Sequence, residues 1–319
     1  MSPKYNSNFE DDFIVLGARQ PAEAAKILRE LGEETLADRL AAADSSRVRG
    51  AGAFATGLPI WPFQDRAWQH TAHAFGFITL DDSSTSLKPI KFAGAIQPDQ
   101  SLKSTPIKIT LDRLRVADYP GGGTHNILFD FYARNQVQDA EEHLHFNVYL
   151  RALEGQEAAV IGHPIFVGLN VGSEGLALRC RTINVRNDAD ENMLSFLESD
   201  TFRSGLRLFS TAQPALIPFS EMAVGIASGI LKRNRNVPVQ DFFLGLDFSK
   251  VVTGARLAQG SYIIIQIPDR LQRIWDWNDW QYDPLTGSIV NLRDANRILP
   301  YNYIVLGLTK LQDDQRIDD

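Results

Sequence analysis

The histidines offer the first place to look for chemistry in this chain of 319 residues. His143 and His145 lie two residues apart, and a strand puts every second side chain on one face, so the pair could hold a transition metal together with His125. The opposite strand face carries the apolar residues, so we expect both histidines to point into water. His70 and His73 stand at helical spacing, and we expect no metal there either.

Motifs for nucleophilic catalysis and nucleotide binding are missing from the sequence. Cys180 is the single cysteine, and with no histidine in evidence as its partner we expect a small buried side chain on a strand. Gly121–Gly123 precedes a strand, whereas a phosphate-binding loop opens a helix. No H-E-x-x-H, paired C-x-x-C or G-x-S-x-G sequence occurs. We therefore expect a protein without enzymatic activity.

An aromatic segment is the most distinctive local feature. Trp275, Trp277 and Trp280 are three of the five tryptophans of the chain, and Tyr282 follows them in a polar, turn-rich stretch. Strand-like alternation would put Trp275 and Trp277 on one side and Trp280 and Tyr282 on the other. The cluster could anchor a protein partner or a membrane interface, or it could close one end of a core. The sequence leaves these two interpretations open.

A basic segment follows an apolar helix near the middle of the chain. Phe219–Leu231 is apolar but rises only about 20 Å as a helix, too short for a hydrocarbon core of about 30 Å. Lys232, Arg233 and Arg235 come directly after it, so the helix could lie at a membrane surface. Alternatively, the helix packs against a sheet and the basic residues complement its dipole. We take the three tryptophans and these three basic residues as candidate contact residues.

Charge and targeting signals restrict the possible partners and compartment. The net charge of −7 argues against nucleic acid as a partner, since such binding needs clustered cations. Arg179, Arg181 and Arg186 form a second small basic group, which we expect to be solvated. The N-terminus has no signal-peptide pattern. These features predict a cytoplasmic protein, with a peripheral place at a membrane as an option.

The first 86 residues form a section that we expect to be helical. Pro21 suits a first helical position, and the residues from Ala22 to Leu31 favour helix. A second helix is expected over Glu33–Ala43 and a third over Asp65–Phe75. Asp81–Ser86 is a polar linker, so we place a domain boundary there, between residues 1–86 and 87–319.

Beyond the linker the hydrophobic period changes to two. Alternation of this kind predicts strands with one buried face, which is typical of antiparallel sheets. A helical insertion is expected around residues 192–231, covering Asn192–Leu208 and Pro218–Leu231. The whole is then a mainly β protein, α+β overall, built as an antiparallel sandwich of two packed sheets. The predicted strands are Ile107–Leu111, Ile127–Phe131, Leu144–Leu150, Ile165–Leu169, Leu176–Val185, Phe242–Phe248, Tyr262–Ile267 and Tyr303–Leu308.

Three stretches resemble a C2-type β-sandwich, a module that binds lipids or proteins and often holds calcium. They are IKITLDRLRVADYPGGGTHNILFDFY, LRCRTINVRNDADENMLSFL and ARLAQGSYIIIQIP. The resemblance implies a C2-like fold, with Asp118 at the first calcium position and Asp188 and Asp190 as the later carboxylate pair. Calcium takes six to eight oxygen ligands, so three carboxylates imply a weak calcium site or none.

Taken together, these features favour a non-catalytic binding or adaptor protein. It would present its C2-like sandwich to a membrane surface or a protein partner, without a cofactor other than weakly bound calcium. A structural or assembly subunit of an oligomeric or phage-related complex is the first alternative, and a homo-oligomer would fit it. An enzyme of an unrecognised type is the second, because sandwiches host many functions.

Overall fold

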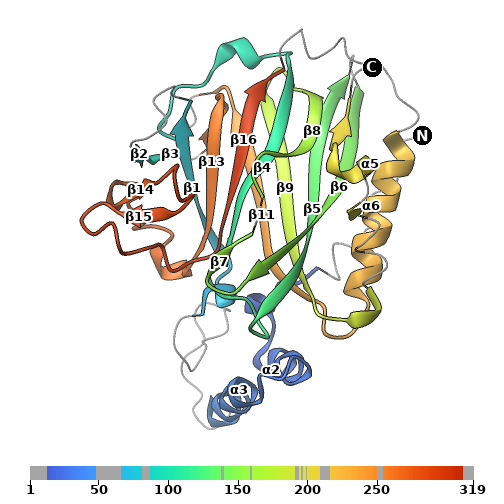
Figure 1. The fold of residues 1–319 in the computed structure, drawn as a ribbon, viewed down its shortest axis with the longest axis vertical. Helices are drawn as coiled ribbons and strands as arrows, with labels where there is room; N and C mark the ends of the chain where they lie inside the picture. The colour runs from blue at the N-terminus through green and yellow to red at the C-terminus, as the bar shows by residue number, and fades with distance from the viewer. Residues whose placement is uncertain are drawn as a thin grey trace.

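The computed structural model describes residues 13–47, 66–80, 87–137, 140–158, 160–190, 194, 197–198, 200–208, 216–249 and 254–311. Two helices lie at the start of this described part of the chain. After a 3₁₀ turn η1 (Leu16–Ala18) come α2 (Pro21–Glu30) and α3 (Glu34–Arg47). Pro21 begins α2, where its missing N–H costs nothing. Both helices confirm the sequence-based expectation, and they lie together below the sheets in Figure 1.

The third expected helix, Asp65–Phe75, is wrong. The chain makes a 3₁₀ turn η2 (Ala67–Gln69) and then enters strand β1 (Ala72–Thr79). β1 pairs antiparallel with β13 (Gly260–Ile267) along its whole length. Both faces of β1 are largely buried, so its side chains lack the polar alternation that marks a half-exposed strand. The expected linker Asp81–Ser86 lies outside the described residues, and the division into domains stays a prediction.

β1 and β13 belong to the larger of two facing sheets. Its strands run in the order β10-β8-β4-β16-β13-β1-β3, with β7 beside β4. All described pairings in it are antiparallel except that of β10 with β8. The remaining strands are β3 (Lys91–Phe92), β4 (Pro106–Val116), β7 (Gln156–Glu157), β8 (His163–Asn170), β10 (Leu206–Arg207) and β16 (Tyr303–Lys310).

The second sheet has five strands, in the order β12-β11-β9-β5-β6. Its two longest strands, β5 and β6, form a hairpin in continuous register. Among the described strands of this second sheet, only β12 runs parallel to its neighbour. The strands are β5 (Thr124–Val137), β6 (Ala140–Leu153), β9 (Gly175–Val185), β11 (Val237–Asp247) and β12 (Ala255–Arg256).

The two sheets pack face to face across one apolar core (Figure 1). The ring centroids of Phe146 on β6 and Phe166 on β8 are 6.5 Å apart. At the other side of the sandwich, Phe75 of β1 faces Phe242 of β11, with the centroids 6.4 Å apart. Each strand therefore turns one face inward, as the period of two predicted.

A small third sheet lies outside the large one. It consists of β2 (Lys88–Pro89), β14 (Trp280–Tyr282) and β15 (Ile289–Asn291). Together with the chain before β14, it covers a second apolar cluster on the outer face of the large sheet, which includes Ile263 and Ile265 of β13. The large sheet is thus buried on both faces over its β1–β13 part.

Helix α6 (Leu216–Leu231) confirms the expected apolar helix and lies beside β6 (Figure 1). Ser220 on this helix accepts a hydrogen bond at 3.0 Å from the main-chain N–H of His145. Its buried positions recur at helical spacing: Ala223, Ile226, Ala227 and Ile230. This face packs against the sheet, as one of the two sequence-based interpretations proposed.

The other expected insertion helix, Asn192–Leu208, is only partly realised. Several of its residues lie outside the described chain, and α5 (Asp200–Arg203) is short. Leu206 and Arg207 form strand β10 instead of helix, because their main chain pairs in parallel with Phe166 and Val167 of β8. A nonlocal partner decides their conformation.

At the coarse level the fold prediction holds: the protein is mainly β, with N-terminal helices and open antiparallel or mixed sheets. All eight strands predicted from alternation are present as β4, β5, β6, β8, β9, β11, β13 and β16. A C2 topology is not shown. No helix in the described part of the chain is long and apolar enough to cross a membrane.

Candidate functional site

The aromatic segment is held against the outer face of the large sheet by local turns. Asp276 caps the 3₁₀ turn η6 (Trp277–Asp279), because its carboxylate accepts a hydrogen bond at 2.9 Å from the N–H of Asn278. This turn directs Trp277 into the second apolar cluster, where it is only 5% exposed. Trp277 therefore plugs a core, whereas Trp275 and Trp280 are half-buried.

The tryptophan rings contact one another in an order that alternation did not predict. Trp275 stacks on Trp280, with centroids 6.0 Å apart and planes at 3°. Trp277 meets Trp275 edge-on at 5.7 Å. The expected separation of Trp275 and Trp280 onto opposite sides is wrong, because η6 interrupts the extended chain between them. Edge and stacked contacts of this kind fix ring positions.

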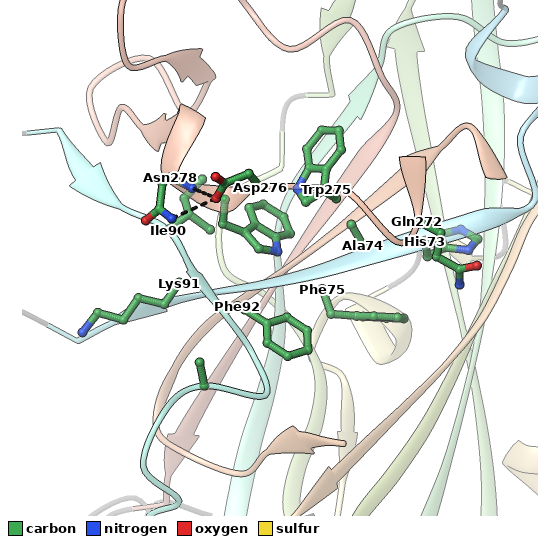
Figure 2. A pocket seen from close by; sticks show the side chains of 12 residues that line it. His73, Ala74, Phe75, Ile90, Lys91, Phe92, Gln272, Trp275, Asp276 and Asn278 are labelled. Carbon is green, nitrogen blue, oxygen red and sulfur yellow. Dashed lines mark hydrogen bonds between the residues drawn. The ribbon is translucent and has the colours of Figure 1, made fainter. Parts of the chain in front are cut away.

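A groove of about 750 Å³ opens between this segment and the β1 side of the sandwich. Three parts of the chain line it: β1 with His73, Ala74 and Phe75, the β3 region with Ile90–Phe92 and Ala95, and the aromatic segment with Gln272 and Trp275–Asn278. Figure 2 shows Trp275 across the groove from Phe75 and Phe92, with His73 and Gln272 together at one end. The volume is in the range of ligand sites, about 300–1,000 Å³.

The edge of β1 lies open along this groove. β3 pairs with only Gly76 and Phe77, and one further hydrogen bond runs from the Ala93 N–H to the Phe75 carbonyl. The chain then leaves for the second sheet, where the Arg256 N–H donates to the Ala93 carbonyl. Within the described residues, no strand continues the pairing along Ala72–Ala74.

Two buried polar atoms at the groove have no hydrogen-bond partner among the described residues. One is the Nε2 of His73, a residue that is 9% exposed. Burial lowers the pKa of His73 to about 4, against the opposing effect of a hydrogen bond to the Thr71 main chain. The ring is thus neutral at pH 7 and offers an acceptor. The other atom is the indole N–H of Trp275, a donor.

The aspartates of the expected calcium site have other partners. Asp118 accepts two hydrogen bonds from Arg66, at 2.5 and 2.6 Å, and this pairing raises the pKa of Arg66. Asp190 is fully buried, 2.7 Å from Arg233 Nη1, and accepts a hydrogen bond from Asn236 at 2.6 Å. No group of three or more His, Cys, Asp or Glu among the described residues could hold a metal ion. The structure therefore does not assemble a site from these aspartates.

The basic segment meets the same acidic loop. Arg233 pairs with Asp190, and Arg235 lies 3.8 Å from Asp188, whose side chain is 93% exposed. Lys232 is exposed. Two of the three candidate basic contacts are thus neutralised by two of the three candidate metal ligands, an arrangement that only the fold reveals.

The histidines on β6 differ from expectation. His145 does not point into water: it is buried, and its Nδ1 lies 3.3 Å from Asp130 Oδ1. His143 is half-buried and contacts the Tyr132 hydroxyl at 2.5 Å. His145 thus lies beside a carboxylate of the neighbouring strand β5, and His143 beside the hydroxyl of Tyr132 on the same strand. His125 is also fully buried.

Sequence reasoning missed a row of charges across this outer face. Asp130, Arg181 and Asp241 are direct neighbours on β5, β9 and β11, and Arg179 makes a two-bonded pair with Asp241 at 2.8 and 2.7 Å. The expectation of a solvated Arg179 and Arg181 is wrong, since both are buried. The sequence signal that could have indicated this row is the alternation of arginine with apolar residues on β9, together with single aspartates, Asp130 and Asp241, within otherwise apolar strands.

Cys180 is buried, as expected. Burial raises the pKa of its thiol well above the ordinary value, so the thiolate is disfavoured. In the sheet register Cys180 is opposite Phe131, whereas His145 is opposite Tyr132, the next residue along. Neighbouring residues of a strand face opposite ways, so this thiol and this imidazole lie on different faces of the sheet.

Within the described part of the chain, this groove combines a concave shape, aromatic walls and unpaired polar groups. Comparisons of the chain with protein-family models, with curated proteins and with solved structures gave no match.

Proposed function

We propose that this protein is a non-catalytic binding protein that holds an extended segment of a protein partner in the groove beside Trp275. The observation that carries the proposal is the groove itself, with aromatic side chains on both sides and an unpaired donor and acceptor within it. Apolar walls with a few oriented polar groups are typical of ligand sites, and aromatic residues dominate interface energies.

A protein segment fits these features better than a membrane surface. Trp277 points into a core and Trp275 and Trp280 stack on each other, so their rings do not extend outward as interfacial anchors do. Arg233 and Arg235 face aspartates, so they supply little net positive charge to attract anionic headgroups. The groove rim carries one cation and one carboxylate, Lys91 and Asp276, which also leaves no net charge.

Two substitutions in the groove test the proposal without touching the core. Phe92 is 44% exposed and lines the groove, so Phe92→Ser removes one wall. Ala95 is exposed and also lines the groove, so Ala95→Arg fills it with a long side chain. Phe243→Ser is the matched control, because Phe243 is 63% exposed and lies on β11 of the other sheet.

A phage-displayed library of random peptides, selected on the wild-type protein, supplies a defined probe. We expect the synthesised peptides to bind Phe92→Ser and Ala95→Arg at least about tenfold more weakly, a change of about 1.4 kcal/mol, and to bind Phe243→Ser unchanged. Melting temperatures of all three variants should match the wild type. Peptides that bind every variant equally, or a library that yields no binder, would contradict the proposal.

Vesicles of phosphatidylserine and phosphatidylcholine provide the competing test. We expect no sedimentation of the wild-type protein with them at physiological ionic strength. Sedimentation that is lost in Phe92→Ser would assign the groove to a membrane instead. The molecular mass from size-exclusion chromatography of the same samples tests the alternative of an assembly subunit, which predicts an oligomer.

A further inference from the structure

We propose that the partner binds as an added β-strand along the open edge of β1, with its main chain hydrogen-bonded to the main-chain N–H and C=O of His73. This inference rests on the function proposed above and specifies the ligand as an extended peptide without net charge at the bound residues. The juxtaposition that carries it is a free strand edge inside an aromatic groove.

The direction of the main-chain groups follows from the hydrogen bond that ends the β3 pairing. The Phe75 carbonyl accepts the Ala93 N–H, so the main chain of Phe75 points to the β3 side. Main-chain groups alternate in direction along a strand, and His73 therefore points the same way as Phe75. No described strand pairs with that edge of His73. Its N–H and C=O are available as one donor and one acceptor.

The open run is long enough for a short added strand. Ala72–Ala74 spans about 10 Å at about 3.3 Å per residue. The other edge of these residues is fully used by β13, through the pairs with Ile267, Gln266 and Ile265. The edge is therefore already formed as a strand before a partner binds, which lowers the entropic cost of adding a strand.

The two unpaired side-chain atoms are one hydrogen-bond acceptor and one donor, and a peptide unit can pair with both. His73 Nε2 accepts a hydrogen bond and the Trp275 indole N–H donates one. A peptide unit carries one N–H and one C=O, so it satisfies both types of group, whereas a hydrocarbon chain satisfies neither. Lys91 and Asp276 at the rim have opposite charges, which matches a neutral main chain and not an anionic headgroup.

Side chains of the added strand alternate between the two walls. Every second residue would meet the Trp275 side, and the residues between would meet Phe75 and Phe92, which lie across the groove in Figure 2. Aromatic and β-branched side chains fit these walls, because flat and branched groups pack well on pleated surfaces.

Histidine labelling gives a direct readout in the full-length protein. The chain has six histidines, so ¹⁵N-histidine labelling yields few main-chain amide signals, and His73→Gln identifies that of His73. On addition of a peptide selected as above, we expect the His73 amide to shift and its hydrogen exchange to slow at least about tenfold, as a new hydrogen bond requires. The amides of His125 and His145, both in the five-stranded sheet, serve as references and should not change.

N-methylation of the peptide tests the strand mode from the other side. Methylating one peptide nitrogen at a time should weaken binding about tenfold or more at the one position whose N–H donates to the His73 carbonyl, and little at the two positions beside it, because a strand turns every second N–H toward its neighbour. A peptide that binds wild type but not Ala95→Arg, tolerates every N-methyl group and leaves the His73 amide unchanged would overturn strand addition, while groove binding would stand.

The remaining outcomes also decide the proposal. If no peptide binds, both the groove function and the strand mode fail. If the wild-type protein self-associates and Ala95→Arg restores the monomer, a second copy of the chain occupies the edge, and recognition of a separate partner is overturned. Peptide binding by a monomer, with one N-methyl-sensitive position between two tolerant ones and a protected His73 amide, supports strand addition.

Discussion

Trp277 lies directly over Gly76 of β1: a Cβ placed on this glycine would be 2.7 Å from Cη2 of the indole and 2.6 Å from Cγ2 of Ile90. Both distances are shorter than packed carbon atoms adopt, so only glycine lets the indole lie this close to the strand. The glycine therefore links the sheet to the aromatic segment that forms one side of the groove.

Gly76→Ala should push Trp277 out of the cluster and destabilise the protein by about 1–3 kcal/mol, the usual cost of overpacking. Urea denaturation followed by tryptophan fluorescence measures this change. Gly225→Ala is the control: Gly225 is exposed on α6 and a Cβ there meets nothing within 4 Å, so alanine should stabilise by about 0.5–1 kcal/mol through its higher helix propensity. Equal effects of the two substitutions would refute the packing argument.

Asp190 and Asp188 should respond very differently to the same substitution. Asp190→Asn leaves Arg233 without its buried carboxylate, so we expect a loss of about 2–4 kcal/mol of unfolding free energy. Asp188→Asn changes a 93% exposed side chain and should stay within about 0.5 kcal/mol of wild type. Chemical denaturation of both variants is the measurement, and a harmless Asp190→Asn would show that the ion pair contributes nothing.

His73 should make the folded state less stable in acid. Burial lowers the pKa of His73 to about 4 in the folded protein, whereas an unperturbed histidine, as in the unfolded chain, has a pKa of 6.5. Between these two pH values the unfolded chain therefore binds the additional proton. The contribution is complete above pH 6.5 and is lost as the pH falls toward 4, by about 3 kcal/mol. His73→Phe removes this titration, and the variant should lose less stability than wild type over the same window. Identical pH dependence of the two proteins would contradict the burial of a neutral ring.

Removing residues 1–86 should yield an insoluble or non-cooperatively melting protein. The deletion takes away β1, which pairs with all eight residues of β13, and leaves an isoleucine-rich edge unpaired. A fragment that starts at Arg66 keeps β1 and is the matched comparison; it should remain soluble, although less stable. Circular dichroism melts of both fragments decide the point. A cooperative transition of residues 87–319 would support the domain boundary placed at residue 86.

The sequence by itself determined the elements whose pattern is local. Leu144–Leu150 alternates because one face of β6 meets the core, and Pro21 marks the start of α2. The prediction that Trp275, Trp277 and Trp280 are contact residues came from their clustering in a polar, turn-rich stretch, yet it did not distinguish the buried Trp277 from the half-buried Trp275. That difference depends on a 3₁₀ turn and on the sheet beneath it.

Only the tertiary structure decided the features formed by residues that are far apart in the sequence. The helix predicted over Asp65–Phe75 is wrong where it overlaps the first half of β1, because covering both faces of a strand removes its polar alternation. His73 and Trp275 share a groove although about 200 residues separate them, and the row of Asp130, Arg181 and Asp241 exists only through the register of three strands. Strand register depends on nonlocal pairing, which a single sequence does not encode in any local period. For this reason the aromatic half of the candidate site was predictable and the β1 half was not.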